Sequence, residues 1–256
     1  MSVMVAQCPL IEKRLLREDL YDFTVRCPEI AHAAKPGQFI MVRCGDFTLR
    51  RPISICDADG DRLRFVFEVR GAGTAWLAER NIGEELDILG PQGNGFDIGD
   101  TSRPAVFVGG GIGIFPLLHA GKPFNANATV LLGFRTASLM AMVEDFQQAG
   151  ADVRIATDDG TAGYHGLVTE LLAVRCAEGP VATIFACGPK PMLKATATEA
   201  EKRNISCQLS LEQRMACGVG ACLGCAQKIL RSDGTEYFAH VCSDGPVFDA
   251  RVVVWN

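Results

Sequence analysis

Four cysteines near the C-terminal end of the chain have the spacing of iron–sulfur ligands. Cys217, Cys222 and Cys225 follow a C-x4-C-x2-C pattern, and Cys242 is the next cysteine along the chain. This is the ligand spacing of a plant-type two-iron, two-sulfur cluster. The small residues between the first three let the backbone fold tightly around inorganic sulfide and direct its amides at the sulfurs. The pattern predicts a 2Fe-2S cluster held by these four cysteines, and therefore a chain that moves single electrons.

Two other uses of these cysteines remain open. Zinc also takes four thiolates, but its structural sites usually contain two C-x2-C pairs, and only Cys222 and Cys225 form one. Ordinary buried thiols are the second alternative. For the six cysteines without any motif, an odd total, scattered placement and no export signal predict reduced thiols that are buried as small hydrophobic side chains. These six are Cys8, Cys27, Cys44, Cys56, Cys176 and Cys207.

A glycine-rich turn follows the apolar stretch 105–108 and leads into a helical pattern. Its glycines are Gly109, Gly110, Gly111 and Gly113. Without side chains the backbone can approach a pyrophosphate closely, and the helix start offers free amides. The turn differs from the G-x-G-x-x-G of the usual dinucleotide site, because Pro116 replaces the last glycine. It predicts nucleotide binding, with a tight structural turn as the alternative.

Two further motifs lie in the first hundred residues. Arg51-Pro52-Ile53-Ser54 matches R-P-[IL]-S, and Gly71-Ala72-Gly73-Thr74 matches G-x-G-T, the paired flavin signatures of the ferredoxin reductase family. From about residue 1 to residue 206 the chain resembles that family. An arginine suits a flavin pyrophosphate, because its planar fork pairs with two oxygens.

This resemblance implies that FAD is bound by a defined set of residues. They are Arg51, Pro52, Ile53, Ser54, Val66, Phe67, Glu68, Gly73 and Thr74. A carboxylate near phosphates would repel them, so the role of Glu68 is open.

A third match is Cys187-Gly188-Pro189-Lys190-Pro191-Met192, which has the form C-G-P-x-P-M. In the ferredoxin reductase family this turn lies beside the nicotinamide. The resemblance implies that Cys187, Gly188 and Pro189 shape the place where hydride passes between NAD and the flavin. Cys187 is the candidate catalytic residue, and its alternative role is that of a small buried residue at a strand end.

The hydrophobic pattern predicts the elements that position these motifs. In the stretch 63–70 apolar and polar residues largely alternate, and strands are also expected at 21–25, 39–43 and 86–89, with a short helix at 74–80 capped by Thr74. Apolar strands at 105–108, 130–132, 153–156 and 184–186 alternate with helical stretches. The last segment ends in a strand-like stretch at 251–255. We therefore expect a multi-domain protein with a flavin-binding antiparallel β-barrel (1–100), a parallel α/β nucleotide-binding domain (101–206) and a small 2Fe-2S module (207–256).

Composition limits the classes of partner. The chain has 256 residues, 48% of them hydrophobic, and a net charge of −5 without a basic tract, which argues against nucleic acid. It lacks a signal-peptide pattern and any run of about 18 apolar residues, so no membrane association and a cytoplasmic location are expected.

The combination of motifs resembles the family of electron-transfer subunits of NAD-linked dihydroorotate dehydrogenase. The match includes S-L-E-Q-R-M-A-C-G-V-G-A-C from Ser210 to Cys222, and the closing stretch from Cys242 to Phe248. The resemblance implies that a separate FMN-containing catalytic subunit oxidises dihydroorotate. Electrons then pass singly through the cluster to FAD and leave as hydride to NAD, in pyrimidine (UMP) biosynthesis. One FAD and one cluster per chain, and a heterotetramer of two plus two subunits with the cluster loop facing the partner, are implied as well.

Other functions remain possible on these motifs. Flavin subunits of hydrogenase, sulfide dehydrogenase and ferredoxin reductase complexes share the flavin and nucleotide motifs, but often vary the cluster ligands, so four intact cysteines favour the dihydroorotate reading. A non-enzymatic redox sensor is disfavoured because all the reductase motifs are intact. A preference for NAD over NADP is not decided, since no arginine pair for a 2'-phosphate is evident.

Overall fold

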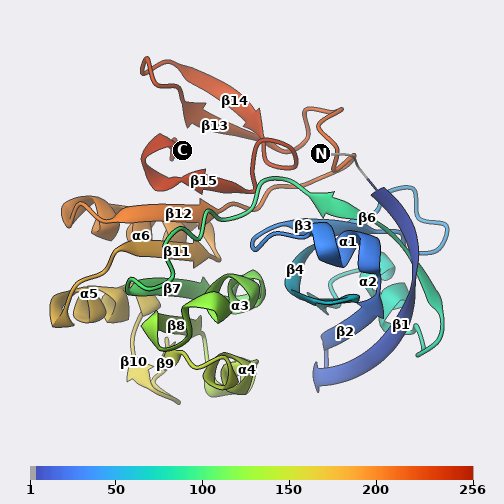
Figure 1. Ribbon diagram of the computed structural model, residues 1–256, viewed down its shortest axis with the longest axis horizontal. Coiled ribbons are helices and arrows are strands. Elements are labelled where there is room, and N and C mark those ends of the chain that lie inside the picture. The colour runs from blue at the N-terminus through green and yellow to red at the C-terminus, as the bar shows by residue number, and fades with distance from the viewer. Residues whose placement is uncertain (1–3, 256) are drawn as a thin grey trace.

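Alternating side chains build a closed barrel from the first third of the chain (Figure 1). The computed structural model describes residues 4–255. Leu63, Phe65 and Phe67 fill the barrel interior, as the alternation predicts. The strands follow the closed order β1-β2-β5-β4-β3-β6. Their bounds, with those of the two helices in this part, are β1 (Met4–Arg17), β2 (Leu20–Arg26), β3 (Phe39–Val42), β4 (Arg51–Asp59), β5 (Arg62–Glu68), β6 (Glu85–Gln92), α1 (Pro28–Ala33) and α2 (Ala72–Ala78).

The apolar strands of the middle segment pair into one mostly parallel sheet with the order β10-β9-β8-β7-β11-β12-β15. The order reverses direction between β7 and β11, which is where nucleotides bind in such sheets. The strands are β7 (Ala105–Gly110), β8 (Ala128–Phe134), β9 (Asp152–Thr157), β10 (Tyr164–His165), β11 (Thr183–Cys187), β12 (Ser206–Ser210) and β15 (Val247–Asp249). The helices around the sheet are α3 (Phe115–Gly121), α4 (Val143–Gln148), α5 (Val168–Glu178) and α6 (Lys190–Lys202), with 3-10 turns η1 (Gly111–Ile114), η2 (Lys122–Asn127) and η3 (Ala137–Leu139).

The C-terminal segment contains a hairpin of β13 (Ala226–Leu230) and β14 (Glu236–His240), which stands at the β15 end of the sheet (Figure 1). It is not an isolated unit. Cys225, Ile229 and Val241 share a hydrophobic core with residues of the sheet and with Met41 of β3. β15 pairs antiparallel with β12, so this segment also extends the sheet. Cys225 and Cys242, two of the predicted cluster ligands, are therefore anchored to both larger parts of the molecule.

The predicted strand at 251–255 is wrong. A 3-10 turn, η4 (Ala250–Val252), occupies its start, and only Val253 forms a bridge, to Ile229. The Asp249 side chain accepts a hydrogen bond from the backbone amide of Arg251 at 2.9 Å, which starts the turn and ends the strand.

The helix expected at 74–80 begins earlier, because Gly71 is its N-cap. Thr74 instead lies in the first turn, where its hydroxyl accepts hydrogen bonds from the amides of Arg70 (2.9 Å) and Gly71 (3.2 Å). The prediction that Thr74 is the N-cap is thus wrong, because Thr74 lies three residues after the N-cap Gly71. Its side chain still holds the turn by satisfying amides that precede the helix.

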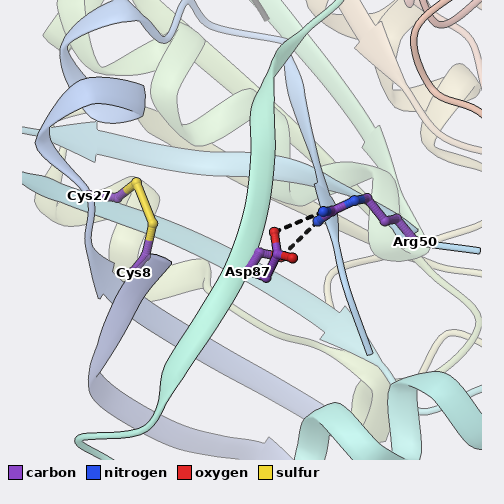
Figure 2. Close-up of a disulfide and its surroundings, with 4 residues drawn as sticks. All are labelled: Cys8, Cys27, Arg50 and Asp87. Carbon is purple, nitrogen blue, oxygen red and sulfur yellow. Dashed lines mark hydrogen bonds and ion pairs between the residues drawn. A yellow bond between two sulfur atoms is a disulfide. The ribbon is translucent and has the colours of Figure 1, made fainter. Parts of the chain in front are cut away.

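Two of the six motif-free cysteines form a disulfide (Figure 2). Cys8 on β1 and Cys27 just before α1 have Cα atoms 5.2 Å apart, within the usual range for a disulfide. The expectation of reduced thiols is therefore wrong for this pair, since the barrel brings together two residues that lie apart in sequence. The expectation of burial is confirmed for both, and for Cys44, Cys56 and Cys207, whereas Cys176 is half-buried.

Ion pairs connect the barrel to the sheet. Arg64 of β5 pairs with Asp22 of β2 at 2.8 Å and with Asp145 of α4 at 2.6 Å. The Asp22 side chain is 1% exposed, so this pair is held away from solvent. Lys122 of η2 also pairs with Asp57 of β4. These contacts fix the angle between the two parts and so shape the space between them.

Within residues 4–255, no helix combines the length and the apolar character needed to cross a membrane.

Candidate functional site

A cavity of about 260 Å³ lies where the barrel, the sheet and the segment after β12 meet. Its walls are mainly apolar with a few polar groups, as is usual for a site that binds a planar cofactor. The barrel contributes Phe39, Arg51, Pro52, Ile53, Ser54, Val66, Phe67, Glu68, Arg70 and Thr74. The sheet side contributes Ile112, Phe115 and Cys187, and the C-terminal segment contributes Ser210, Leu211, Glu212, Gln213, Met215 and Pro246.

Every FAD residue predicted from the sequence borders this cavity except Gly73. Gly73 contributes in a different way, because a methyl group there would lie 2.5 Å from the Arg51 guanidinium. A side chain at residue 73 would therefore displace the flexible end of Arg51 from this position. Arg51 also stacks over the Phe47 ring, with 5.3 Å between the guanidinium carbon and the ring centroid. Nearby, Arg50 pairs with Asp87 at 2.8 Å, which fixes the start of β4 to β6 (Figure 2).

Two arginines offset the negative charge of Glu68. Its carboxylate pairs with Arg17 of β1 and with Arg70, the latter at 2.5 Å. The negative charge of Glu68 is therefore balanced. A phosphate or flavin bound nearby would not be repelled as it would be by an unpaired carboxylate.

The glycine turn and the C-G-P turn pack directly against each other at the ends of β7 and β11. A methyl group at Gly113 would lie 2.4 Å from the Cys187 carbonyl oxygen, and one at Gly110 would lie 3.0 Å from the Pro189 ring. Gly188 has φ at +157°, and a methyl group there would lie 3.0 Å from the backbone nitrogen of Gly110. These glycines are thus required by packing between the turns. Gly111 has φ at +56° and open space where a side chain would be, so a ligand can approach the backbone there.

The Cys187 thiol is 2% exposed and lies beside Ser210 of the neighbouring strand. Burial raises its pKa to about 12, and the charge of Glu212 acts in the same direction. The group therefore stays a neutral thiol at physiological pH. It can shape the cavity wall and contact a nicotinamide ring, but it is not a thiolate nucleophile.

Sequence reasoning missed the wall formed by the segment after β12. Leu211, Glu212 and Met215 belong to the S-L-E-Q-R-M stretch, which the sequence predicts as part of the 2Fe-2S module (207–256) without a role in the flavin cavity. Glu212 keeps contact with solvent while it lines the cavity. Burial by the surrounding atoms raises the pKa of its carboxyl, and the positive charge of Arg70 opposes that shift.

The four predicted cluster cysteines converge as two pairs. Cys217 interacts with Cys222, and Cys225 with Cys242. Cys217 also acts electrostatically on Cys242, so the two pairs are neighbours. Two pairs suit a two-iron cluster, because each iron takes two protein ligands.

Backbone amides point at these sulfurs. The amides of Val219 and Cys222 lie 3.5 and 3.4 Å from the Cys217 sulfur, and the amide of Gly220 lies 3.1 Å from the Cys242 sulfur. Burial acts to raise the pKa of Cys217, but these hydrogen bonds outweigh it and lower the pKa to about 6. Burial and the neighbouring Cys225 raise the pKa of Cys242 to about 12. Gly218 and Gly220 have φ at +69° and +76°, values that glycine adopts easily and that let the loop curl around the sulfurs.

Comparison with known proteins agrees with this arrangement. Residues 212–254 match the family model described as the iron-sulfur cluster binding domain of dihydroorotate dehydrogenase B. The electron transfer subunit of dihydroorotate dehydrogenase B (NAD(+)) from Caldanaerobacter subterraneus subsp. tengcongensis is 40% identical over 248 residues, covering 96% of this chain and 97% of the relative. The subunit of the same description from Bacillus caldolyticus is 40% identical over 252 residues, covering 94% of this chain and 95% of the relative.

Among solved structures, that of the NADH-dependent reduced ferredoxin-NADP oxidoreductase superposes with a TM-score of 0.85 at 29% identity, covering 98% of this chain and 90% of that one. The ferredoxin reductase of carbazole 1,9a-dioxygenase has a TM-score of 0.67 at 21% identity over 80% of this chain and 67% of that one, which shows the shared fold. The barrel, the mostly parallel sheet and the cysteine-rich loop agree with these similarities over nearly the full length. The chain belongs to the family of electron transfer subunits of dihydroorotate dehydrogenase B.

Proposed function

We propose that this chain receives electrons from an FMN-containing subunit that oxidises dihydroorotate, and delivers them as hydride to NAD⁺ in pyrimidine biosynthesis. One observation carries the proposal most directly: the segment 210–217 lines the cavity with Met215 and supplies the cluster ligand Cys217 only two residues later. A cluster and a flavin held by the ends of one short segment are close neighbours, as electron transfer requires.

In this proposal each part of the chain has a distinct task. Residues of 1–100 hold FAD, with Arg51 on its phosphates and Ser54 and Thr74 as hydroxyl contacts. Residues of 101–206 hold NAD at the glycine turn and at Cys187, Gly188 and Pro189. The segment 207–256 holds the cluster through Cys217, Cys222, Cys225 and Cys242. Bound FAD supplies the exchange between single electrons and hydride, which neither a two-iron cluster nor nicotinamide can perform alone.

The partner is proposed to dock over the cluster loop, in an assembly of two chains of each kind. Cys225 and Cys242 are buried, whereas Cys217 and Cys222 are only half-buried. The loop beside the outer pair exposes Leu223, which is 78% accessible. Val219 of the same loop is also exposed, at 41%, and two exposed apolar side chains in one loop support a protein partner at this surface.

The ferredoxin-linked relatives provide a second candidate function. The similarity to the NADH-dependent reduced ferredoxin-NADP oxidoreductase supports a chain that exchanges electrons with a ferredoxin. Rapid NADH-dependent reduction of a ferredoxin, with no transfer from dihydroorotate when the catalytic subunit is present, would favour that candidate.

Replacing Cys222 with serine tests the proposed route. We expect the Cys222→Ser variant to lose the cluster's iron and its electron paramagnetic resonance signal, and to lose transfer from dihydroorotate. Anaerobic bleaching of its FAD by NADH should persist, because hydride transfer does not need the cluster. Cys176→Ser, at a half-buried cysteine on α5, is the matched control and should retain both activities. A Cys222→Ser variant with full coupled activity would refute the route.

A further inference from the structure

Glu212 places a carboxyl group in the wall of the cavity. It follows β12 and lines the cavity together with Ser210 and Met215. Across residues 4–255, its carboxylate makes no hydrogen bond or ion pair that would hold its charge. Glu68, the other carboxyl in the cavity wall, pairs with Arg17 and Arg70.

The proposed reaction needs a proton at this place. NAD⁺ accepts a hydride, which consists of two electrons and one proton. The cluster passes electrons only, so two electrons arrive without the proton that must accompany them. The protons lost by dihydroorotate leave in the partner subunit. For every NADH formed, one proton must therefore enter the flavin cavity from a side chain or from water.

The titratable groups that line the cavity differ in their ability to supply it. Arg51 and Arg70 carry guanidinium groups, which do not serve as proton donors in proteins. The Cys187 thiol is buried, and burial raises its pKa to about 12, so it releases its proton only with difficulty. Glu68 is held by two arginines. Glu212 alone combines a free carboxyl with contact both to the cavity and to solvent.

We propose that Glu212 is the proton donor of the flavin cavity. This inference rests on the proposed route from cluster to FAD. For each pair of electrons, the O–H bond of the Glu212 carboxyl breaks and its proton joins them; the resulting hydride forms the new C–H bond of NADH. The Glu212 carboxylate then regains a proton from water through its solvent-exposed side. When NADH reduces the flavin, the hydride carries its own proton and Glu212 is not needed.

The surroundings of Glu212 set the direction of the pH dependence. Arg70 and Arg51 face the cavity from the barrel, Glu68 lies on β5, Cys187 on β11, and Arg214 on the same segment as Glu212. Burial raises the pKa of Glu212, and Arg70 opposes this. A raised pKa keeps the acid form populated to a higher pH than for an ordinary glutamate. The rate of electron-only reduction should therefore be fastest below this pKa and fall as pH rises through it.

The test compares two reductants of the chain loaded with FAD and cluster. Reduced methyl viologen supplies electrons without protons, and NADH supplies hydride. In anaerobic stopped-flow experiments, we expect Glu212→Gln to slow flavin reduction by viologen at least about tenfold, within the range of general acid effects, and to abolish its pH dependence. Reduction by NADH should stay within about twofold of the wild type, since hydride needs no added proton. Glu201→Gln, an exposed carboxyl on α6, is the control and should match the wild type with both reductants.

Infrared difference spectra give a readout that does not depend on turnover. The carbonyl band of a protonated carboxyl should change when the flavin is reduced in the wild type and in Glu201→Gln, and this change should be absent in Glu212→Gln.

Unchanged viologen rates and an unchanged pH profile in Glu212→Gln would overturn the proposal. Equal slowing with both reductants would also overturn it, because that result indicates a role in positioning. If Glu212→Gln loses FAD, Glu212→Asp decides: a retained pH-dependent step and band support the proposal, and their loss overturns it. Because viologen replaces the partner, failure here leaves the dihydroorotate route itself untouched.

Discussion

At the residue scale, the arginine of the flavin signature depends on the glycine of its companion motif. Arg51 and Gly73 lie on different elements, and the Arg51 guanidinium occupies the space that any side chain at residue 73 would fill. Stacking on Phe47 further limits the directions that Arg51 can take. An arginine held in this way loses less conformational freedom when it binds a phosphate, which strengthens binding.

We predict that Arg51→Ala weakens FAD retention. Charge-assisted hydrogen bonds contribute about 1.5–3 kcal/mol each, so the Kd for FAD should rise about tenfold or more. Flavin content after gel filtration measures the loss. Arg26→Ala, which removes an exposed arginine paired with Asp61 at 3.0 Å, is the control. Equal flavin content in both variants would show that Arg51 does not hold the cofactor.

Short local motifs explain which site residues could be predicted. R-P-I-S, G-x-G-T and C-G-P each place their residues through a few neighbouring bonds, and Arg51, Thr74 and Cys187 of these motifs do line the cavity. Glu212 and Met215 enter the cavity because β12 ends beside β11, and the partners of Glu68 come from another strand and from the following loop. Such contacts depend on tertiary structure, which no spacing along the chain reveals.

At the element scale, the nucleotide end of the sheet is built from two turns in contact. The turn after β7 and the turn after β11 approach so closely that neither tolerates an added side chain at Gly113 or Gly188. Because both strands end at the same edge of the sheet, this contact sets the floor of the cavity beside Cys187.

We predict that Gly113→Ala destabilises the protein and disturbs reduction by NADH. The new methyl group would meet the Cys187 carbonyl oxygen at 2.4 Å, and overpacking of this kind costs about 1–3 kcal/mol. Urea unfolding and NADH-dependent flavin bleaching measure the two effects. Gly179→Ala is the control, because Gly179 has an extended backbone and open space around it. An unfolding free energy for Gly113→Ala equal to that of the control would contradict the packing argument.

Elements with a clear hydrophobic period were predictable, and the others were not. The strands β5, β7, β8, β9 and β11 carry apolar residues in the expected pattern. β1 was missed although it has 14 residues, because only Cys8 and Leu10 in it are buried and many of its other residues are polar. Strand pairing in the barrel stabilises β1 where its own sequence gives little indication.

At the scale of the whole molecule, the three parts of the chain act as one frame around the cavity. Arg64 joins two barrel strands to α4, and Asn94 donates hydrogen bonds to the carbonyls of Ser243 (3.2 Å) and Asp244 (3.0 Å), beside the proposed cluster ligand Cys242. Buried Met41 of the barrel packs against Gly218 of the cluster loop. These contacts hold the cluster loop at a fixed place relative to the flavin cavity.

We predict that Leu223→Glu weakens association with the catalytic subunit at least about tenfold, because an unpaired carboxylate would be buried in the interface. The chain's own FAD and iron content should not change. Ile82→Glu, at a side chain that is 63% exposed on the barrel, is the control. Calorimetry or gel filtration with the purified partner measures the affinity. Full-strength binding by Leu223→Glu would place the interface elsewhere.

The most direct test of the central claim is the formation of NADH from dihydroorotate and NAD⁺ under anaerobic conditions. This chain, loaded with FAD and cluster, is mixed with the FMN-containing dihydroorotate dehydrogenase subunit from the same organism. We predict that NADH appears only when both chains are present. If both carry their cofactors and no NADH forms, this chain does not carry electrons from dihydroorotate.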